Sequence, residues 1–311
     1  MKFKFVAFLL LSILSVNAQK NVADSLVKKA ELKEKDKDYF YAIILVEKAI
    51  KADPSNDDLY YYKGTLELLM KNYKESRRTY QTAISKFPTK STPYMQMGDF
   101  FHDVFALDSS LFYFNKAIKM AENDSLRFHY TAMRGGTYAR MKKFKKAEKD
   151  FLFACKNQPE NPFALNGLSL TYLSMKEYNK SIFWLKKMVV FDTTSSSYTN
   201  LGLLYTTVDS LEMAIQYFDK ALAMDKESAF TYSNRGECYY KMKKYDEAMK
   251  DINYSIKLNP KNSWAYQNKA KVLIALGKTS DACKELNTAE ELGYEVLYDN
   301  EVKELIKSNC K

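Results

Sequence analysis

Two histidines and four cysteines are the residues of this 311-residue sequence best suited to metal binding or nucleophilic chemistry. His102 and His129 have no cysteine or paired carboxylates at metal-ligand spacing, which indicates surface or groove histidines rather than a zinc site. The sequence contains no G-x-x-x-x-G-K phosphate loop, no G-x-S-x-G elbow and no H-E-x-x-H motif. Acidic and basic side chains are plentiful but form no convergent set. We therefore expect a protein that is not an enzyme and that needs no cofactor and no metal.

The first eighteen residues have the three parts of a secretory signal. Lys2 and Lys4 come first, an apolar run from Phe5 to Val16 follows, and the segment ends at Ala18 with small residues where a signal peptidase requires them. The apolar run is shorter than the roughly twenty residues that span a bilayer. We expect cleavage after Ala18 and export to the periplasm or the exterior of a bacterial cell, with no transmembrane segment left after cleavage.

The charge of the chain is basic, with a formal net charge of +10. Such a surplus can mark a nucleic-acid partner, but export argues against one. Many basic residues also lie in short polar turns, as at Lys142 and Lys143, where charge keeps a turn solvated. We interpret them as surface residues and expect no nucleic-acid partner. Attraction to an acidic partner or to anionic envelope lipid is the alternative.

Internal repetition dominates the rest of the chain. Small residues recur at steps of 33 to 37 residues, and a bulky residue follows each of them four places later. The small residues are Ala42, Ser76, Ser110, Ala147, Ser181, Ala214, Ala248 and Ala282. Each unit contains two amphipathic segments of about three turns with a polar break between them, which predicts stacked helix pairs. One pair cannot bury its own apolar face, but neighbouring pairs cover one another.

The repeat pattern resembles that of the tetratricopeptide repeat family, W-x2-L-G-x2-Y, then A-x3-F, then P, at a period of about 34 residues. The best-matching segment carries it as Tyr232, Arg235-Gly236, Tyr239, Ala248, Ile252 and Pro260. The resemblance implies an all-α fold, a right-handed α-α superhelix of about eight helix pairs. The predicted units are 23–56, 57–90, 91–124, 128–161, 162–194, 195–228, 229–262 and 263–296. Residues 297–311 are predicted to add a C-terminal capping helix.

Three asparagines occupy one column of the last three units. Asn200, Asn234 and Asn268 stand at the sixth place, 34 residues apart. In the tetratricopeptide repeat family the first helix of each pair lines the concave face. The resemblance therefore implies that these amides form a ladder in the groove. An amide donates and accepts hydrogen bonds, which suits the backbone of an extended chain. Coincidence in an asparagine-rich sequence is the alternative.

Four aromatic residues are further candidates for contact with a partner in this groove. Phe163, Phe230 and Trp264 occupy the second place of their units, and Tyr240 occupies the twelfth place of its unit. Exposed aromatic side chains are frequent anchors of binding partners. Packing against an adjacent helix is the alternative for each of them.

The four cysteines divide into two groups. Cys155 and Cys238 lie too many repeats apart to meet, so both are expected to be reduced and packed as small apolar residues. Cys283 lies near the start of the last predicted repeat helix, and Cys310 lies at the end of the predicted cap. An antiparallel cap would bring these two sulfurs together as a disulfide in an oxidising compartment. Two unpaired thiols are the alternative.

These observations favour a non-catalytic interaction scaffold of the bacterial cell envelope. Its partner is expected to be an extended peptide or another protein bound in the concave groove. The alternative is a structural subunit whose repeats stack or pack within a larger envelope complex. A large apolar patch on the convex face would favour the second hypothesis, because such patches mark assembly surfaces.

Overall fold

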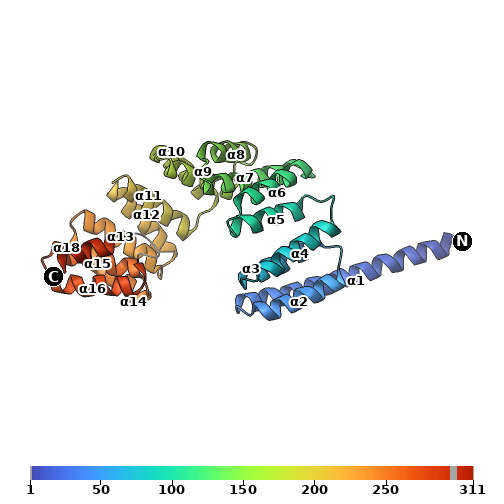
Figure 1. Cartoon of the computed structure of the whole chain (residues 1–311), viewed down its shortest axis with the longest axis horizontal. Coiled ribbons are helices and arrows are strands. Elements are labelled where there is room, and N and C mark those ends of the chain that lie inside the picture. The colour runs from blue at the N-terminus through green and yellow to red at the C-terminus, as the bar shows by residue number, and fades with distance from the viewer. Residues whose placement is uncertain (1, 295–299, 311) are drawn as a thin grey trace. The chain divides into compact units, whose positions relative to one another are not determined.

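The computed structural model describes residues 2–294 and 300–310, with side chains from residue 18 onward. Within these ranges every regular element is an α-helix. The chain forms two compact units, residues 1–159 and 160–311. Consecutive helices pair along the chain in each unit (Figure 1). The predicted all-α fold of helix pairs is therefore confirmed.

The N-terminal unit contains four helix pairs. They are α1 (Lys2–Lys35) with α2 (Tyr39–Ala52), α3 (Asp57–Leu69) with α4 (Tyr73–Lys86), α5 (Thr92–Asp103) with α6 (Leu107–Met120), and α7 (Asp124–Arg140) with α8 (Phe144–Asn157). Helix α1 passes through Ala18 without a break. The three residues 125–127, which separate two predicted units, lie in the first turn of α7, where Asn123 accepts a hydrogen bond from the amide of Leu126 at 2.9 Å.

The C-terminal unit contains four more pairs and a final helix. They are α9 (Pro162–Ser174) with α10 (Tyr178–Phe191), α11 (Ser195–Thr207) with α12 (Leu211–Met224), α13 (Ala229–Lys241) with α14 (Tyr245–Leu258), α15 (Ser263–Ala275) with α16 (Thr279–Glu291), and α18 (Glu301–Asn309). Among the described residues, no helix is both long and apolar enough to cross a membrane.

Small residues let the two helices of each pair approach closely. Gly202 on α11 faces the fully buried ring of Phe218 on α12, and a Cβ at Gly202 would lie 2.5 Å from that ring. Where the small residue is serine, it also ties the helices together. The Ser181 hydroxyl on α10 donates to the Ser169 carbonyl oxygen on α9 at 2.8 Å. The recurring small and bulky columns of the sequence are therefore the seams within the pairs.

The turn inside each pair has the same backbone geometry. In every turn one residue has a positive φ, between 57° and 74°, and seven of these eight residues are not glycine. They are Lys37, Lys71, Phe105, Lys142, Lys176, Asp209, Lys243 and Gly277. The next residue donates its amide back across the helix end, as from Lys244 to the Tyr239 carbonyl at 2.9 Å, which is the hydrogen bond of a Schellman motif.

Helix α18 covers the last pair. Val302 is fully buried in a cluster with Leu286 and Tyr294. Its neighbour Glu301 accepts hydrogen bonds from Gln267 at 2.7 Å and Lys271 at 2.6 Å, both on α15. A helix in this place shields apolar surface that a further repeat would otherwise bury.

The cysteines lie as the sequence predicts. Cys283 on α16 and Cys310 after α18 form a disulfide with a Cα–Cα distance of 5.7 Å. Cys155 and Cys238 are buried thiols. Burial raises the pKa of Cys238 to about 11, and its sulfur lies 3.1 Å from the Thr206 hydroxyl.

Candidate protein-binding surface

The three asparagines of the predicted ladder lie in different environments. Asn200 on α11 is exposed. Asn234 is 3% exposed, and its amide donates to the Phe230 carbonyl oxygen of the same helix at 2.7 Å. Asn268 is 1% exposed and donates to the Ser233 carbonyl oxygen of α13 at 3.2 Å. The expectation that all three amides project into an open groove is therefore wrong for Asn234 and Asn268.

The packing of the first helices explains this difference. More residues are in mutual contact between α13 and α15 than between α11 and α13, and Asn268 on α15 donates directly to the Ser233 carbonyl oxygen of α13. An amide at that seam is covered by protein and bonds to a main-chain carbonyl. Asn200 lies on α11, which has fewer contacts with α13, and its side chain is exposed to solvent. One asparagine of the column is thus available to a partner, while two serve the packing of the repeats.

The predicted aromatic anchors divide in the same way. Phe163 and Phe230 are 48% and 46% exposed. Trp264 is half-buried and stacks on Tyr294 with ring centroids 5.9 Å apart. Tyr240 is also half-buried, and its ring centre lies 6.3 Å from that of Tyr245. Phe163 and Phe230 therefore remain accessible to a partner, whereas Trp264 and Tyr240 pack mainly within the chain.

A pair of arginine clamps is a feature that the repeat pattern alone does not reveal. Arg235 on α13 binds both carboxylate oxygens of Asp251 on α14, at 2.6 and 2.8 Å, and also reaches Asp219 on α12 at 2.6 Å. Arg134 and Asp150 repeat the two-point contact in the N-terminal unit, at 2.8 Å for both bonds. Each clamp fixes the two helices of a pair in register. Its sequence signal is an arginine followed sixteen residues later by an aspartate.

The histidines are engaged in packing. The Nδ1 atom of His102 lies 3.1 Å from the Thr137 hydroxyl, and the His129 ring lies against Tyr130. Burial lowers the pKa of both imidazoles, so the neutral form is favoured at each. The described residues include no group of three histidine, cysteine or acidic side chains placed to hold a metal ion.

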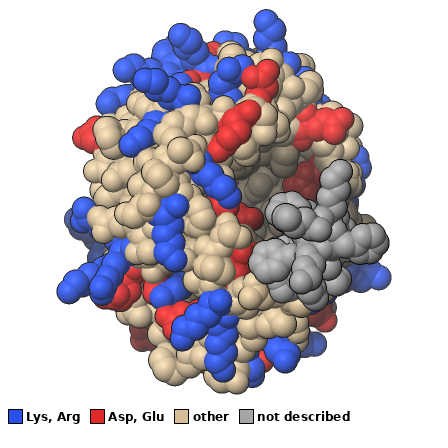
Figure 2. All heavy atoms as spheres, turned by 90° about the vertical axis from the view of Figure 1, so that its right-hand side faces the viewer, with Lys and Arg blue, Asp and Glu red and all other residues tan. Residues whose placement is uncertain are grey.

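Basic side chains are spread over the surface. On the face drawn in Figure 2, lysines and arginines lie at dispersed positions with acidic side chains among them. Lys142 and Lys143 are exposed, which agrees with the interpretation of the basic turns as solvated surface.

Family models match the chain at three places. The tetratricopeptide repeat models cover residues 195–228, 229–262 and 252–284, and the first two ranges coincide with two predicted units. Residues 195–284 of the chain therefore carry tetratricopeptide repeats. Repeats of this family typically mediate protein–protein interaction and are generally non-catalytic.

Known proteins with the same repeats are similar to this chain only at a distance. A TPR repeat-containing protein of Methanocaldococcus jannaschii is 23% identical over 207 residues, covering 63% of this chain and 36% of its own length. The chain thus spans about a third of the length of the curated relatives it matches.

Solved structures share the fold. The Cut9–Hcn1 structure has a TM-score of 0.64 at 17% identity, covering 92% of this chain and 55% of the other. A tetratricopeptide repeat protein from Parabacteroides merdae has a TM-score of 0.53 at 18% identity, covering 94% of this chain and all of the other.

Proposed function

We propose that the protein is a non-catalytic scaffold that binds an extended polypeptide or a partner protein along the first helices of its C-terminal unit. The supporting observation is the exposure of large apolar side chains on these helices, namely Phe163 and Leu170 on α9 and Phe230 on α13. Exposing large apolar side chains to water is unfavourable, and patches of exposed apolar groups rimmed by polar residues are typical of binding surfaces. The open amide of Asn200 on α11 adds a donor and an acceptor for a partner's backbone.

The proposed location is the periplasm or the exterior of a bacterial cell. It rests on the basic, apolar and small-residue segments that end at Ala18. Amino-terminal sequencing of the protein recovered from fractionated cells tests it. The expected result is a mature chain that begins at Gln19 in an envelope or extracellular fraction, and an intact chain in the cytoplasm would contradict the proposal.

A second candidate function, assembly into a larger complex, has support on α10. Phe183, Val190 and Phe191 are all exposed on this second helix of a pair. Apolar side chains there suit lateral packing against another protein. Sedimentation of the parent and of a Phe183→Ser/Val190→Ser variant distinguishes the two functions. Assembly predicts a complex that this variant dissociates, whereas the groove scaffold predicts no change in sedimentation.

The decisive experiment compares partner binding by two variants. The immobilised mature protein captures partners from envelope extract, and the affinity of the main captured protein is then measured for each variant. Changing Phe163, Asn200 and Phe230 together to alanine should weaken binding at least about tenfold, because aromatic anchors and hydrogen bonds each contribute on the order of 1 kcal/mol. A parent-like affinity of this triple variant would overturn the proposed surface.

Asn268→Ala is the matched control. It removes an amide from the same column, but a buried one that bonds to the Ser233 carbonyl. We expect it to lower the free energy of unfolding by roughly 1 kcal/mol and to leave the affinity unchanged.

A further inference from the structure

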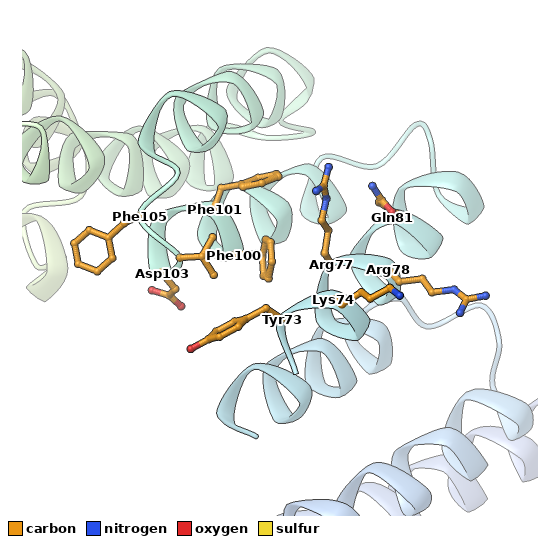
Figure 3. Close-up of a pocket in the computed structure, with 10 residues that line it drawn as sticks. Tyr73, Lys74, Arg77, Arg78, Gln81, Phe100, Phe101, Asp103 and Phe105 are labelled. Carbon is orange, nitrogen blue, oxygen red and sulfur yellow. The ribbon is translucent and has the colours of Figure 1, made fainter. Parts of the chain in front are cut away.

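A cleft of about 1060 Å³ lies in the N-terminal unit, between α4 and the end of α5 with the turn that follows it (Figure 3). Its lining includes Tyr73, Lys74, Arg77, Arg78, Asp103 and Phe105. Figure 3 shows Tyr73 and Phe105 toward one end and the cationic side chains of α4 toward the other. The cleft therefore has an aromatic end and a basic end.

Phe105 departs from its seven counterparts in the other turns. It adopts a φ of 60°, a conformation that costs a bulky side chain free energy, and it is 70% exposed. Five of the other turns carry lysine at this place, one aspartate and one glycine, all of which suit a solvated turn. Phenylalanine offers the backbone of this turn no conformational advantage. An exposed ring at the mouth of a cleft has a use when a ligand covers it.

Arg140 holds this ring in place. Its guanidinium lies 4.4 Å from the centre of the Phe105 ring and donates to the His102 carbonyl oxygen at 2.7 Å. The cation–π contact covers one face of the ring and leaves most of the side chain in solvent. This contact restricts the Phe105 ring before any partner arrives, which lowers the entropy lost on binding.

The basic end of the cleft has an excess of positive charge. Lys74, Arg77 and Arg78 are exposed, and Asp103 is the one carboxylate among the lining residues. Arg78 contacts Glu75 only at 3.9 Å between exposed groups, which is a weak pairing. Arg77 lies over the Phe101 ring at 5.5 Å. This end of the cleft attracts carboxylates and repels cations.

We infer that the cleft binds an acidic segment of another polypeptide, which places one bulky apolar side chain at the aromatic end and carboxylates at the basic end. Charge complementarity selects an acidic partner, and the exposed rings of Tyr73 and Phe105 select the apolar side chain. The site is independent of the first-helix surface of the C-terminal unit. Loss of binding there leaves this inference intact, and the reverse also holds.

The test uses a fluorescein-labelled peptide of aspartates and glutamates with one central phenylalanine, followed by fluorescence anisotropy on the full chain. Two comparison peptides carry alanine in place of the phenylalanine or lysines in place of the acids. We expect saturable binding of the first peptide, at least about fivefold weaker binding of the alanine peptide, and none of the lysine peptide. Binding should weaken as salt is raised.

Two variants of the protein probe the two ends of the cleft. Phe105→Lys installs the residue that most other turns carry, so folding is retained while the anchor is lost, and affinity should fall about tenfold. Phe105→Gly removes the ring and also relieves the backbone, which separates loss of binding from loss of stability. The triple change Lys74→Gln/Arg77→Gln/Arg78→Gln should also reduce affinity about tenfold and flatten the salt dependence.

A matched control removes three charges elsewhere in the same unit, through Lys142→Gln/Lys143→Gln/Lys146→Gln. It should change affinity less than twofold. Equal weakening by this control would show unspecific attraction and overturn the inference, as would parent-like binding by Phe105→Lys. Absence of peptide binding would also overturn it. If phosphatidylglycerol vesicles bound instead, and lost binding with the α4 triple variant, the cleft would be a lipid site.

Discussion

The tight seam between α11 and α12 makes a quantitative prediction about glycine. At Gly202 a Cβ atom would lie 2.5 Å from Cε1 and 2.6 Å from Cδ1 of Phe218. The Phe218 ring is fully buried, so it has no free space into which to move. At Gly135, the same place in another repeat, a Cβ would lie 3.2 Å from Asp150 and Phe151, which a small shift relieves. Alanine should therefore be costly at Gly202 and tolerated at Gly135.

The difference between the two variants isolates the steric cost. Alanine favours a helix over glycine by about 1 kcal/mol, and this gain is common to both sites. Overfilling a packed core costs roughly 1–3 kcal/mol, and this cost falls on Gly202. Gly202→Ala should thus lower the free energy of unfolding by up to about 2 kcal/mol, whereas Gly135→Ala should leave it unchanged or raise it by up to about 1 kcal/mol.

Urea unfolding followed by circular dichroism measures both variants. Because the two glycines lie in different units, hydrogen exchange of peptides from α12 and α8 assigns each change to its own unit. We expect faster exchange in α12 for Gly202→Ala and parent-like exchange in α8 for Gly135→Ala. If both variants gained the full helical preference of alanine, the close approach of Gly202 to Phe218 would be refuted.

Two further predictions concern the disulfide and the partly buried carboxylate of Asp99. Changing Cys283 and Cys310 to serine opens a cross-link between positions 27 residues apart, and should cost about 3–4 kcal/mol, seen as lost exchange protection in α18; parent-like protection would contradict this. Burial, and then the nearby Asp103, raise the pKa of Asp99 to about 6. Protonation of Asp99 therefore stabilises the fold at about pH 4, and this stability is lost as pH rises through 6. Asp99→Asn should raise the free energy of unfolding by up to about 3 kcal/mol at pH 7, seen as a higher urea midpoint, and by much less at pH 4. Equal gains at both pH values would contradict this.

The helix pairs were predictable because their contacts are local and repeated. Gly236 and Ile252 are sixteen residues apart in one unit, and a Cβ at Gly236 would lie 2.7 Å from that isoleucine. The same spacing recurs in every repeat, so each column of the sequence reports one seam several times. The final helix was predictable because Val302, Leu305 and Ile306 recur at helical spacing, and these residues pack against the last pair.

The burial of the asparagine column was not predictable. Asn200 and Asn234 share a residue type and a place in the repeat, yet one is exposed and the other is buried. The packing around each first helix differs from pair to pair, and no single column of the sequence encodes it. Residues 125–127 are a similar case, because an insertion between two units and an extra turn at the start of α7 have the same sequence signature.

Repeats within one chain nevertheless provide an internal comparison for functional residues. The turn position with positive φ places the same demand on the backbone eight times, and a lysine there keeps its charge in solvent near the carboxyl end of a helix, where a cation is favoured. Phe105 adopts the same φ at a steric cost, carries no charge and leaves its ring 70% exposed. Asn268 is the opposite case. It belongs to a conspicuous column of asparagines, but its hydrogen bond to the Ser233 carbonyl oxygen shows that it serves the packing of the helices. A residue that departs from the repeat pattern therefore indicates a partner only where its side chain is exposed to solvent. Phe105 both departs from the pattern and is exposed.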